Sequence, residues 1–224
     1  MSKPARERIV AALLGRHGQT FSAEMGIGLE RNTPTVLFRW LCAALLFSAR
    51  IDHRIAMKAA QALTKNGWTS AKKMAAATWE ERTRTLNHSG YARYDEKTSR
   101  MLADTSQLLL ERYGGDLRKL REKARRDPAC EKKLLMECKG IGSTGADIFL
   151  REVQVAWGEL RPFADAAALK SAGELGLPKT AEELARQVAE NDFPRLLAAL
   201  VRCRLEKDRE KVLAAAGPHS RHHS

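Results

Sequence analysis

The chain of 224 residues has few cysteines, and none of them is spaced to hold a metal. The four thiols stand singly at Cys42, Cys130, Cys138 and Cys203, without a C-x-x-C pair. This spacing argues against a zinc or iron–sulfur framework. Unpaired thiols are typical of a reducing compartment, so we expect a cytoplasmic protein, associated with the nucleoid if its source is bacterial.

Long hydrophobic runs are also missing. The most apolar stretch, WLCAALLF, is far too short to cross a bilayer. The first ten residues, MSKPARERIV, are charged and lack the apolar segment of a secretory leader. We therefore expect no leader peptide and no membrane partner.

Acidic residues are in deficit. The chain has 39 Lys and Arg against 27 Asp and Glu, which gives a net charge of +12 and a pI of about 9.8. Such an excess favours a polyanionic partner, and nucleic acid is the usual one. A generally basic, solvated surface explains the same balance, so charge alone leaves both interpretations open.

Convincing strand alternation is absent, whereas apolar residues recur at helical spacing along nearly the whole chain. The sequence therefore predicts an all-α fold. Residues suited to N-capping mark several helix starts: Thr33 before Pro34, Asp116, Asp165, and Thr180 with Glu183 as a capping box. The expected helices cover residues 5–17, 34–49, 51–67, 69–77, 78–90, 94–115, 116–127, 131–140, 145–158, 165–175, 180–190 and 193–216.

The stretch MECKGIGSTGADIF, Met136 to Phe149, places two glycines around one isoleucine between two helical segments. Glycine allows a sharp turn and close approach of another backbone. The first amides of the following helix, at Gly142, Ser143 and Thr144, have no partner within the helix, and the helix dipole adds positive potential there. Such a site can bind a DNA phosphate whatever the nucleotide sequence, and Lys139 adds positive charge. The stretch therefore predicts a contact with a DNA backbone.

The segment LLMECKGIGSTGADIFL resembles the hairpin of the helix-hairpin-helix DNA glycosylases, the superfamily of endonuclease III, the adenine glycosylase and the 3-methyladenine glycosylases. Further stretches resemble the family in the same order between Leu37 and Leu205: LFRWLCAALLFSARIDHRIAMKAAQAL, LNHSGYARYDEKTSRMLADTSQLLLERYGGDL and FADAAALKSAGEL. The resemblance implies two helical domains with a cleft between them. One domain would be a barrel over 34–158 with the hairpin at about 131–150, and the other would combine 1–33 with 159–216. Residues 217–224 are expected to be a disordered tail.

The family's catalytic aspartate falls on Asp165. The resemblance implies a carboxylate that faces the cleft and stabilises positive charge on the deoxyribose as the base leaves. The local sequence alone also reads as an ordinary N-cap. The two interpretations are compatible, since a capping carboxylate can still face a cleft.

Three departures from the family pattern shape the expected chemistry, and one of them directly follows the aspartate, where Ala166, Ala167 and Ala168 stand in place of the family's His or Asn. Thr144 stands where the members with lyase activity carry a lysine, and no lysine lies between Gly140 and Asp165. We therefore expect a monofunctional enzyme in which water attacks the sugar, without lyase activity by that route. The cluster-binding cysteines of endonuclease III are missing, so we expect no iron–sulfur cluster. The resemblance implies one ion only, a monovalent cation on the backbone carbonyls of Met136, Cys138 and Ile141.

The resemblance also assigns a role to Arg50, and the aromatic rings of two tyrosines outside the hairpin make them further candidates. Arg50 matches the position that fills the gap left by an extruded base, although a surface arginine at a helix end has the same pattern. Tyr91 and Tyr94 are candidates for stacking on that base, with core packing as the alternative. With Lys139, Gly140, Gly142, Ser143 and Thr144 from the hairpin, Arg50 completes the predicted DNA-binding set.

The sequence thus predicts a monomeric glycosylase that removes a damaged base from double-stranded DNA by hydrolysing its N-glycosidic bond. The partner would be damaged or abasic DNA. A DNA-binding protein that keeps the hairpin but catalyses nothing is the alternative. A helical protein-interaction domain with incidental charge is a third interpretation.

Overall fold

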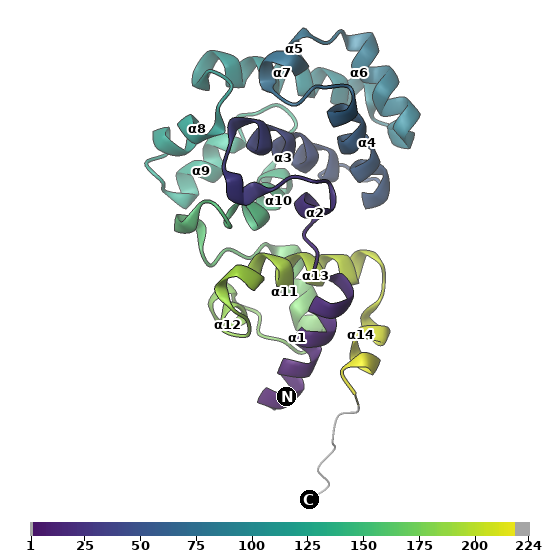
Figure 1. Ribbon diagram of the computed structural model, residues 1–224, viewed down its shortest axis with the longest axis vertical. Helices are drawn as coiled ribbons and strands as arrows, with labels where there is room; N and C mark the ends of the chain where they lie inside the picture. Colours follow the sequence, from purple (N-terminus) through teal and green to yellow (C-terminus); the bar gives the residue numbers. More distant parts are fainter. Residues whose placement is uncertain (1, 218–224) are drawn as a thin grey trace, which may run out of the picture. The chain divides into compact units, whose positions relative to one another are not determined.

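The computed structural model describes residues 2–217, and residues 218–224 of the expected tail lie outside the described residues. No strand occurs between residues 2 and 217, so the predicted all-α class is confirmed (Figure 1). The helices are α1 (Lys3–His17), α2 (Phe21–Glu24), α3 (Pro34–Phe47), α4 (His53–Lys65), α5 (Ala71–Ala76), α6 (Trp79–Leu86), α7 (Asp95–Tyr113), α8 (Leu117–Lys123), α9 (Pro128–Leu135), α10 (Ser143–Val153), α11 (Ala166–Glu174), α12 (Ala181–Ala185), α13 (Phe193–Leu205) and α14 (Arg209–Ala215). Four short helical turns join them: η1 (Leu29–Arg31), η2 (Asn87–Tyr91), η3 (Gly158–Leu160) and η4 (Glu190–Asp192).

Capping side chains set many of the helix starts. The Thr33 hydroxyl accepts a hydrogen bond from the Val36 amide, and Pro34 occupies the first turn of α3, as predicted. The predicted caps at Asp116 and Asp165 are also observed, and the Thr180 hydroxyl accepts from the Glu183 amide. The Glu183 carboxylate is bonded by the Thr180 hydroxyl rather than by the Thr180 amide, so only the first half of the predicted capping box is present. These boundaries follow from local sequence because a cap bonds to an amide only two or three residues away.

The single helix predicted over 193–216 is wrong. The chain ends α13 at Leu205, turns through Lys207 with a φ of +55°, and begins α14 at Arg209. A left-handed residue cannot continue a right-handed helix. The break directs Asp208 toward α1, where Arg16 and His17 bind its carboxylate. This contact between distant parts of the sequence overrides the helical pattern.

The chain forms two compact units. One unit, called here the hairpin unit, is Met25–Leu160. The other, called the terminal unit, combines both ends of the chain, with residues 2–24 and 161–217 described. The units divide at Met25 and Leu160, whereas the sequence placed the divisions at Pro34 and Gly158.

Within the hairpin unit, the apolar helix α3 lies among α4, α8 and α10 (Figure 1). Its buried residues run from Val36 to Leu46 along most of its length. The Trp40 indole donates to the Phe149 carbonyl at 3.1 Å and joins α3 to α10. This contact fixes the helix that follows the glycine turn.

A buried arginine joins α5, α6 and α7 in the same unit. The Arg82 guanidinium donates to the Met74 carbonyl at 3.0 Å, to the Ala77 carbonyl, and to the Ser99 carbonyl at 3.1 Å. No carboxylate forms an ion pair with Arg82 within residues 2–217, and burial lowers the pKa of the guanidinium. Three carbonyl dipoles, two at the end of α5 and one on α7, therefore take the place of a counter-ion.

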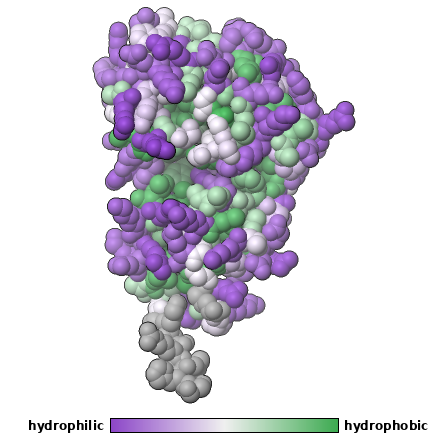
Figure 2. All heavy atoms as spheres, turned by 180° about the vertical axis from the view of Figure 1, so that it is seen from behind, coloured by the Kyte–Doolittle hydropathy of each residue, from purple (hydrophilic) through white to green (hydrophobic). Residues whose placement is uncertain are grey.

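In the terminal unit, α1 packs on α13 and α14, and α11 packs on α13. The Ser171 hydroxyl donates to the Leu200 carbonyl at 2.6 Å, which holds α11 in place. Hydrophilic and hydrophobic residues are interspersed on the face seen in Figure 2. No helix among residues 2–217 combines the length and the hydropathy that crossing a bilayer requires.

Replacing Arg82 with Met should lower the free energy of unfolding by roughly 2–4 kcal/mol, because buried carbonyls lose their donor. Arg84→Met, on the exposed side of the same helix, is the matched control and should change it by less than about 0.5 kcal/mol. Chemical denaturation of both variants checks this. Equal losses in the two variants would contradict the structural role of Arg82.

Candidate functional site

Two helices and a glycine turn form the candidate site for binding a DNA backbone. Helix α9 gives way to a turn at Met136, and α10 begins at Ser143. Within the turn, the Cys138 carbonyl accepts from the Ile141 amide at 3.0 Å. Gly140 lies between them with a φ of +83°, a conformation that L side chains rarely adopt. The predicted helix, glycine turn and helix are therefore present.

The turn is packed tightly against two other helices. A Cβ on Gly140 would lie 2.8 Å from the Met101 sulfur of α7 and 3.2 Å from the Leu45 side chain of α3. The Thr105 hydroxyl of α7 donates to the Lys139 carbonyl at 2.8 Å. A larger residue at position 140 would be strained by the positive φ and would force the Met101 and Leu45 side chains to shift, so glycine suits this position.

The start of α10 is open to solvent. Gly142 occupies the N-cap position, so no side chain caps the first amides of the helix. Gly142, Ser143 and Thr144 are all exposed, and a Cβ on Gly142 would meet nothing within 4 Å. An anion can thus approach these amides without displacing any protein group.

Charges around the turn differ in their availability. Lys132 of α9 pairs with Asp147 of α10 at 2.6 Å, and Arg112 pairs with Glu137. Lys139 is exposed and forms no ion pair among the described residues. The positive charge next to the open helix start is therefore that of Lys139.

Arg50 follows the end of α3, the segment that contacts the hairpin in this unit. The Ser48 Cβ lies 3.6 Å from the position that a Cβ on Gly145 would take, so the end of α3 rests on the start of α10. Arg50 follows two residues later and is exposed. Its location is compatible with the predicted DNA contact, which stays a prediction.

The two tyrosines differ. Tyr91 has no exposed surface, and its hydroxyl donates to the Leu46 carbonyl at 2.9 Å. A covered ring of this kind packs the core and offers no face to a base, which corrects the predicted stacking role of Tyr91. Tyr94 is half-buried with the Arg93 guanidinium 5.4 Å from its ring centre, and its role in a base pocket stays a prediction.

Asp165 belongs to the terminal unit, as the N-cap of α11. Its Oδ1 accepts from the Ala168 amide at 3.0 Å, and the residue is 6% exposed. The predicted capping role is confirmed, while the predicted catalytic role stays a prediction. The residues that follow, Ala166 and Ala167, are exposed.

The carbonyls predicted to hold a monovalent cation belong to the glycine turn. That of Cys138 already accepts the Ile141 amide, but a carbonyl has a second lone pair. The monovalent cation on the carbonyls of Met136, Cys138 and Ile141 stays a prediction. No group of three or more His, Cys, Asp or Glu side chains among residues 2–217 is arranged to hold a metal.

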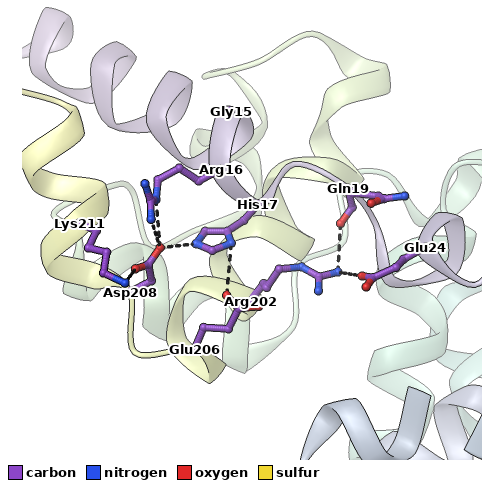
Figure 3. A pocket seen from close by; sticks show the side chains of 9 residues that line it. All are labelled: Gly15, Arg16, His17, Gln19, Glu24, Arg202, Glu206, Asp208 and Lys211. Atoms are coloured by element: carbon purple, nitrogen blue, oxygen red, sulfur yellow. Dashed lines mark hydrogen bonds and ion pairs between the residues drawn. The ribbon is translucent and has the colours of Figure 1, made fainter. Parts of the chain in front are cut away.

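A charged pocket of about 660 Å³ lies in the terminal unit (Figure 3). At its centre, the buried Asp208 carboxylate accepts from Arg16 at 2.8 Å and from His17 at 2.9 Å, and pairs with Lys211 at 3.1 Å. The hydrogen bonds from Arg16, above all, lower the pKa of Asp208 to about 2. At the other end Arg202 pairs with Glu24 at 2.7 Å.

These charges compensate one another, so the pocket links α1, α13 and α14 rather than presenting a free charge to a ligand. The sequence did not predict this cluster. The segment EKDREK around Asp208 reads as continuous helix, and only the break after Leu205 brings the carboxylate to α1.

No protein-family model matches the chain, and no curated protein matches it. Among solved structures, it is similar to "Structure of a Trapped Endonuclease III-DNA Covalent Intermediate: Estranged-Adenine Complex", with 17% identity and a TM-score of 0.47. The match covers 73% of this chain and 71% of that chain. A likeness at this level assigns no activity to this chain.

The two glycines of the turn should respond differently to alanine. Gly140→Ala should lower the free energy of unfolding by roughly 2–4 kcal/mol, since it adds a left-handed strain and a clash with Met101. Gly142→Ala should cost less than about 1 kcal/mol, because its Cβ points into open space. Thermal and chemical denaturation of the pair check this, and an equally large loss in Gly142→Ala would refute the open geometry.

Proposed function

We propose that this chain is a DNA glycosylase that hydrolyses the N-glycosidic bond of a damaged base and leaves an abasic site. The observation that carries the proposal is the open start of α10 behind the Gly140 turn, in a chain of net charge +12. The resemblance of the hairpin and of the segment around Asp165 to the helix-hairpin-helix glycosylases supplies the reaction.

The binding step follows from the open helix start. A phosphate of the DNA backbone accepts hydrogen bonds from the amides of Ser143 and Thr144 and is attracted by the helix dipole. Lys139 adds a point charge beside it. None of these contacts reads a base, so the hairpin holds the strand irrespective of sequence.

The chemical step depends on Asp165. The target bond is not accessible inside the base stack, so the nucleotide must first leave the duplex. The Asp165 carboxylate then stabilises the positive charge that develops on the deoxyribose, and orients the attacking water. Because Thr144 offers no amine, no covalent imine forms at that position, and the product is an unbroken strand with an abasic site.

The second candidate is a DNA-binding protein without catalysis. One observation favours it: Asp165 already caps α11, and three alanines follow it. On this reading the aspartate stabilises a helix and nothing more. The two candidates differ in whether the carboxylate is needed for any activity on DNA.

A cleavage panel separates them. End-labelled duplexes carrying alkylated, oxidised, deaminated or abasic sites are incubated with the wild type and with Asp165→Asn, with and without hot alkali. Strand scission that requires alkali, and that falls at least about 100-fold in the variant, is expected. Asn caps a helix about as well as Asp, so folding should be preserved.

Asp116→Asn, which alters another N-cap, is the matched control and should retain wild-type activity. Scission without alkali, trapped by borohydride, would contradict the inference from Thr144. If no duplex is cleaved while binding stays tight, the non-catalytic candidate is the correct one.

Binding of an undamaged duplex should weaken steeply with salt, since lysines and arginines release counterions from phosphates. Lys139→Gln should reduce the slope of log K against log salt by about one. Lys72→Gln, an exposed lysine of α5 in the same unit, should leave the slope unchanged. Fluorescence anisotropy at several salt concentrations measures both, and equal slopes in all three proteins would exclude Lys139 from the interface.

A further inference from the structure

Glu131, on the first helix of the hairpin, is a buried acid that the proposed function does not use. Its side chain has no exposed surface, and neither carboxylate oxygen meets a hydrogen-bond donor within residues 2–217. An ionised carboxylate in such a position is strongly unfavourable. Its protonation state is therefore set by what surrounds it.

The nearest charged groups already form a pair. Arg121 of α8 binds Glu159 of η3 through two parallel contacts, Nε to Oε1 at 2.5 Å and Nη2 to Oε2 at 2.6 Å. The same guanidinium lies 5.5 Å from the centre of the Trp157 ring. The carboxyl group of Glu159 is also close enough to Glu131 to raise its pKa, so a second, unpaired acid stands beside this ion pair.

The surroundings shift the pKa values of Glu131 and Glu159 in opposite directions. Burial, then the adjacent Glu159, raises the pKa of Glu131 to about 8. Burial opposes ionisation of Glu159 as well, but the bonds from Arg121 outweigh it and lower the pKa of Glu159. Near neutral pH the cluster therefore holds one proton, on Glu131, whose hydroxyl can donate to Glu159.

Other charged groups on the neighbouring elements do not add a cation that would favour the ionised form of Glu131. Asp127, the N-cap of α9, adds a further negative charge and also raises the pKa of Glu131. Helix α10, which packs on α9, carries Asp147, held by Lys132, together with the buried Arg151 and Glu152. Arg121 is the cation that favours the charged form of Glu131.

We propose that the proton shared by Glu131 and Glu159 holds α9 against α8 and η3, and that its loss at alkaline pH loosens the hairpin and weakens its grip on DNA. The part concerning DNA rests on the proposed function. When the proton leaves to solvent, the buried carboxylate of Glu131 stands beside the half-buried pair of Glu159 and Arg121 as a second negative charge. The repulsion between the two carboxylates is relieved by moving α9 away, which disturbs the turn that ends at the start of α10.

The direction of the effect on stability follows from linkage. In the unfolded chain a glutamate ionises near its ordinary pKa of 4.5, whereas in the folded protein Glu131 keeps its proton to about 8. The folded state thus binds more protons over this interval, and the free energy of unfolding falls as pH rises through it. Above it both states are ionised at this group, and the fall ends.

Glu131→Gln tests the proposal, because the Gln amide can donate to Glu159 at every pH. The melting temperature of the wild type should fall from about pH 5 to about pH 8, and that of the variant should fall less and be higher at about pH 8. Glu122→Gln, an exposed acid of α8, should follow the wild type. A wild-type slope in Glu131→Gln would overturn the proposal.

A measurement on the wild type guards against a variant that folds poorly. The carboxyl carbon of Glu131, assigned by its absence from the ¹³C spectrum of Glu131→Gln, should titrate near about pH 8. A midpoint close to the ordinary value would refute the shared proton even if the melting curves differ.

DNA binding provides the second readout, by anisotropy with an undamaged duplex at about pH 7 and about pH 9. Affinity should weaken several-fold in the wild type and in Glu122→Gln but not in Glu131→Gln. If DNA affinity weakens equally in all three proteins, the proton on Glu131 does not control DNA binding by the hairpin. If none of the proteins binds DNA at either pH, the proposed function fails and the link to DNA with it, while the melting curves still decide whether the proton holds α9.

Discussion

The hairpin depends on one close approach, that of the Gly140 backbone to α3 and α7. A side chain there would overlap the Met101 sulfur, so the turn packs on the core only because glycine has none. The side of the turn at Gly140 packs on the core. On the opposite side, at Gly142 and the start of α10, no protein group lies within contact distance of a Cβ at Gly142, and no side chain caps the helix. The same contact therefore fixes the position of the amides and keeps them open.

Much of the fold could be predicted because its signals are local. Thr33, Asp116 and Asp165 cap helices through amides two or three residues away, and the helical period of the apolar residues is strong enough to define an all-α chain. The split between α13 and α14 could not be predicted. It depends on Asp208 meeting Arg16, which is 192 residues distant in the sequence.

In the candidate site too, some features are encoded locally and others depend on residues that are distant in the sequence. The glycine turn is encoded within a few residues, so its geometry followed from the sequence. The buried Tyr91 finds its hydrogen-bond acceptor on Leu46, 45 residues away, and the environment of Glu131 includes the ion pair of Arg121 with Glu159. Such surroundings are assembled from several helices, and no spacing in the sequence records them.

Arg82 carries a charge that is neutralised by carbonyl dipoles rather than by a carboxylate. Mobile ions screen interactions between exposed charges, but they have little access to a guanidinium enclosed by backbone oxygens. The contacts that join α5, α6 and α7 through Arg82 are therefore insensitive to ionic strength, whereas any contact between the exposed basic side chains and a polyanion is sensitive to it. A salt gradient that releases the chain from a polyanionic matrix should leave this unit folded. The protein can therefore be eluted at high salt without being denatured.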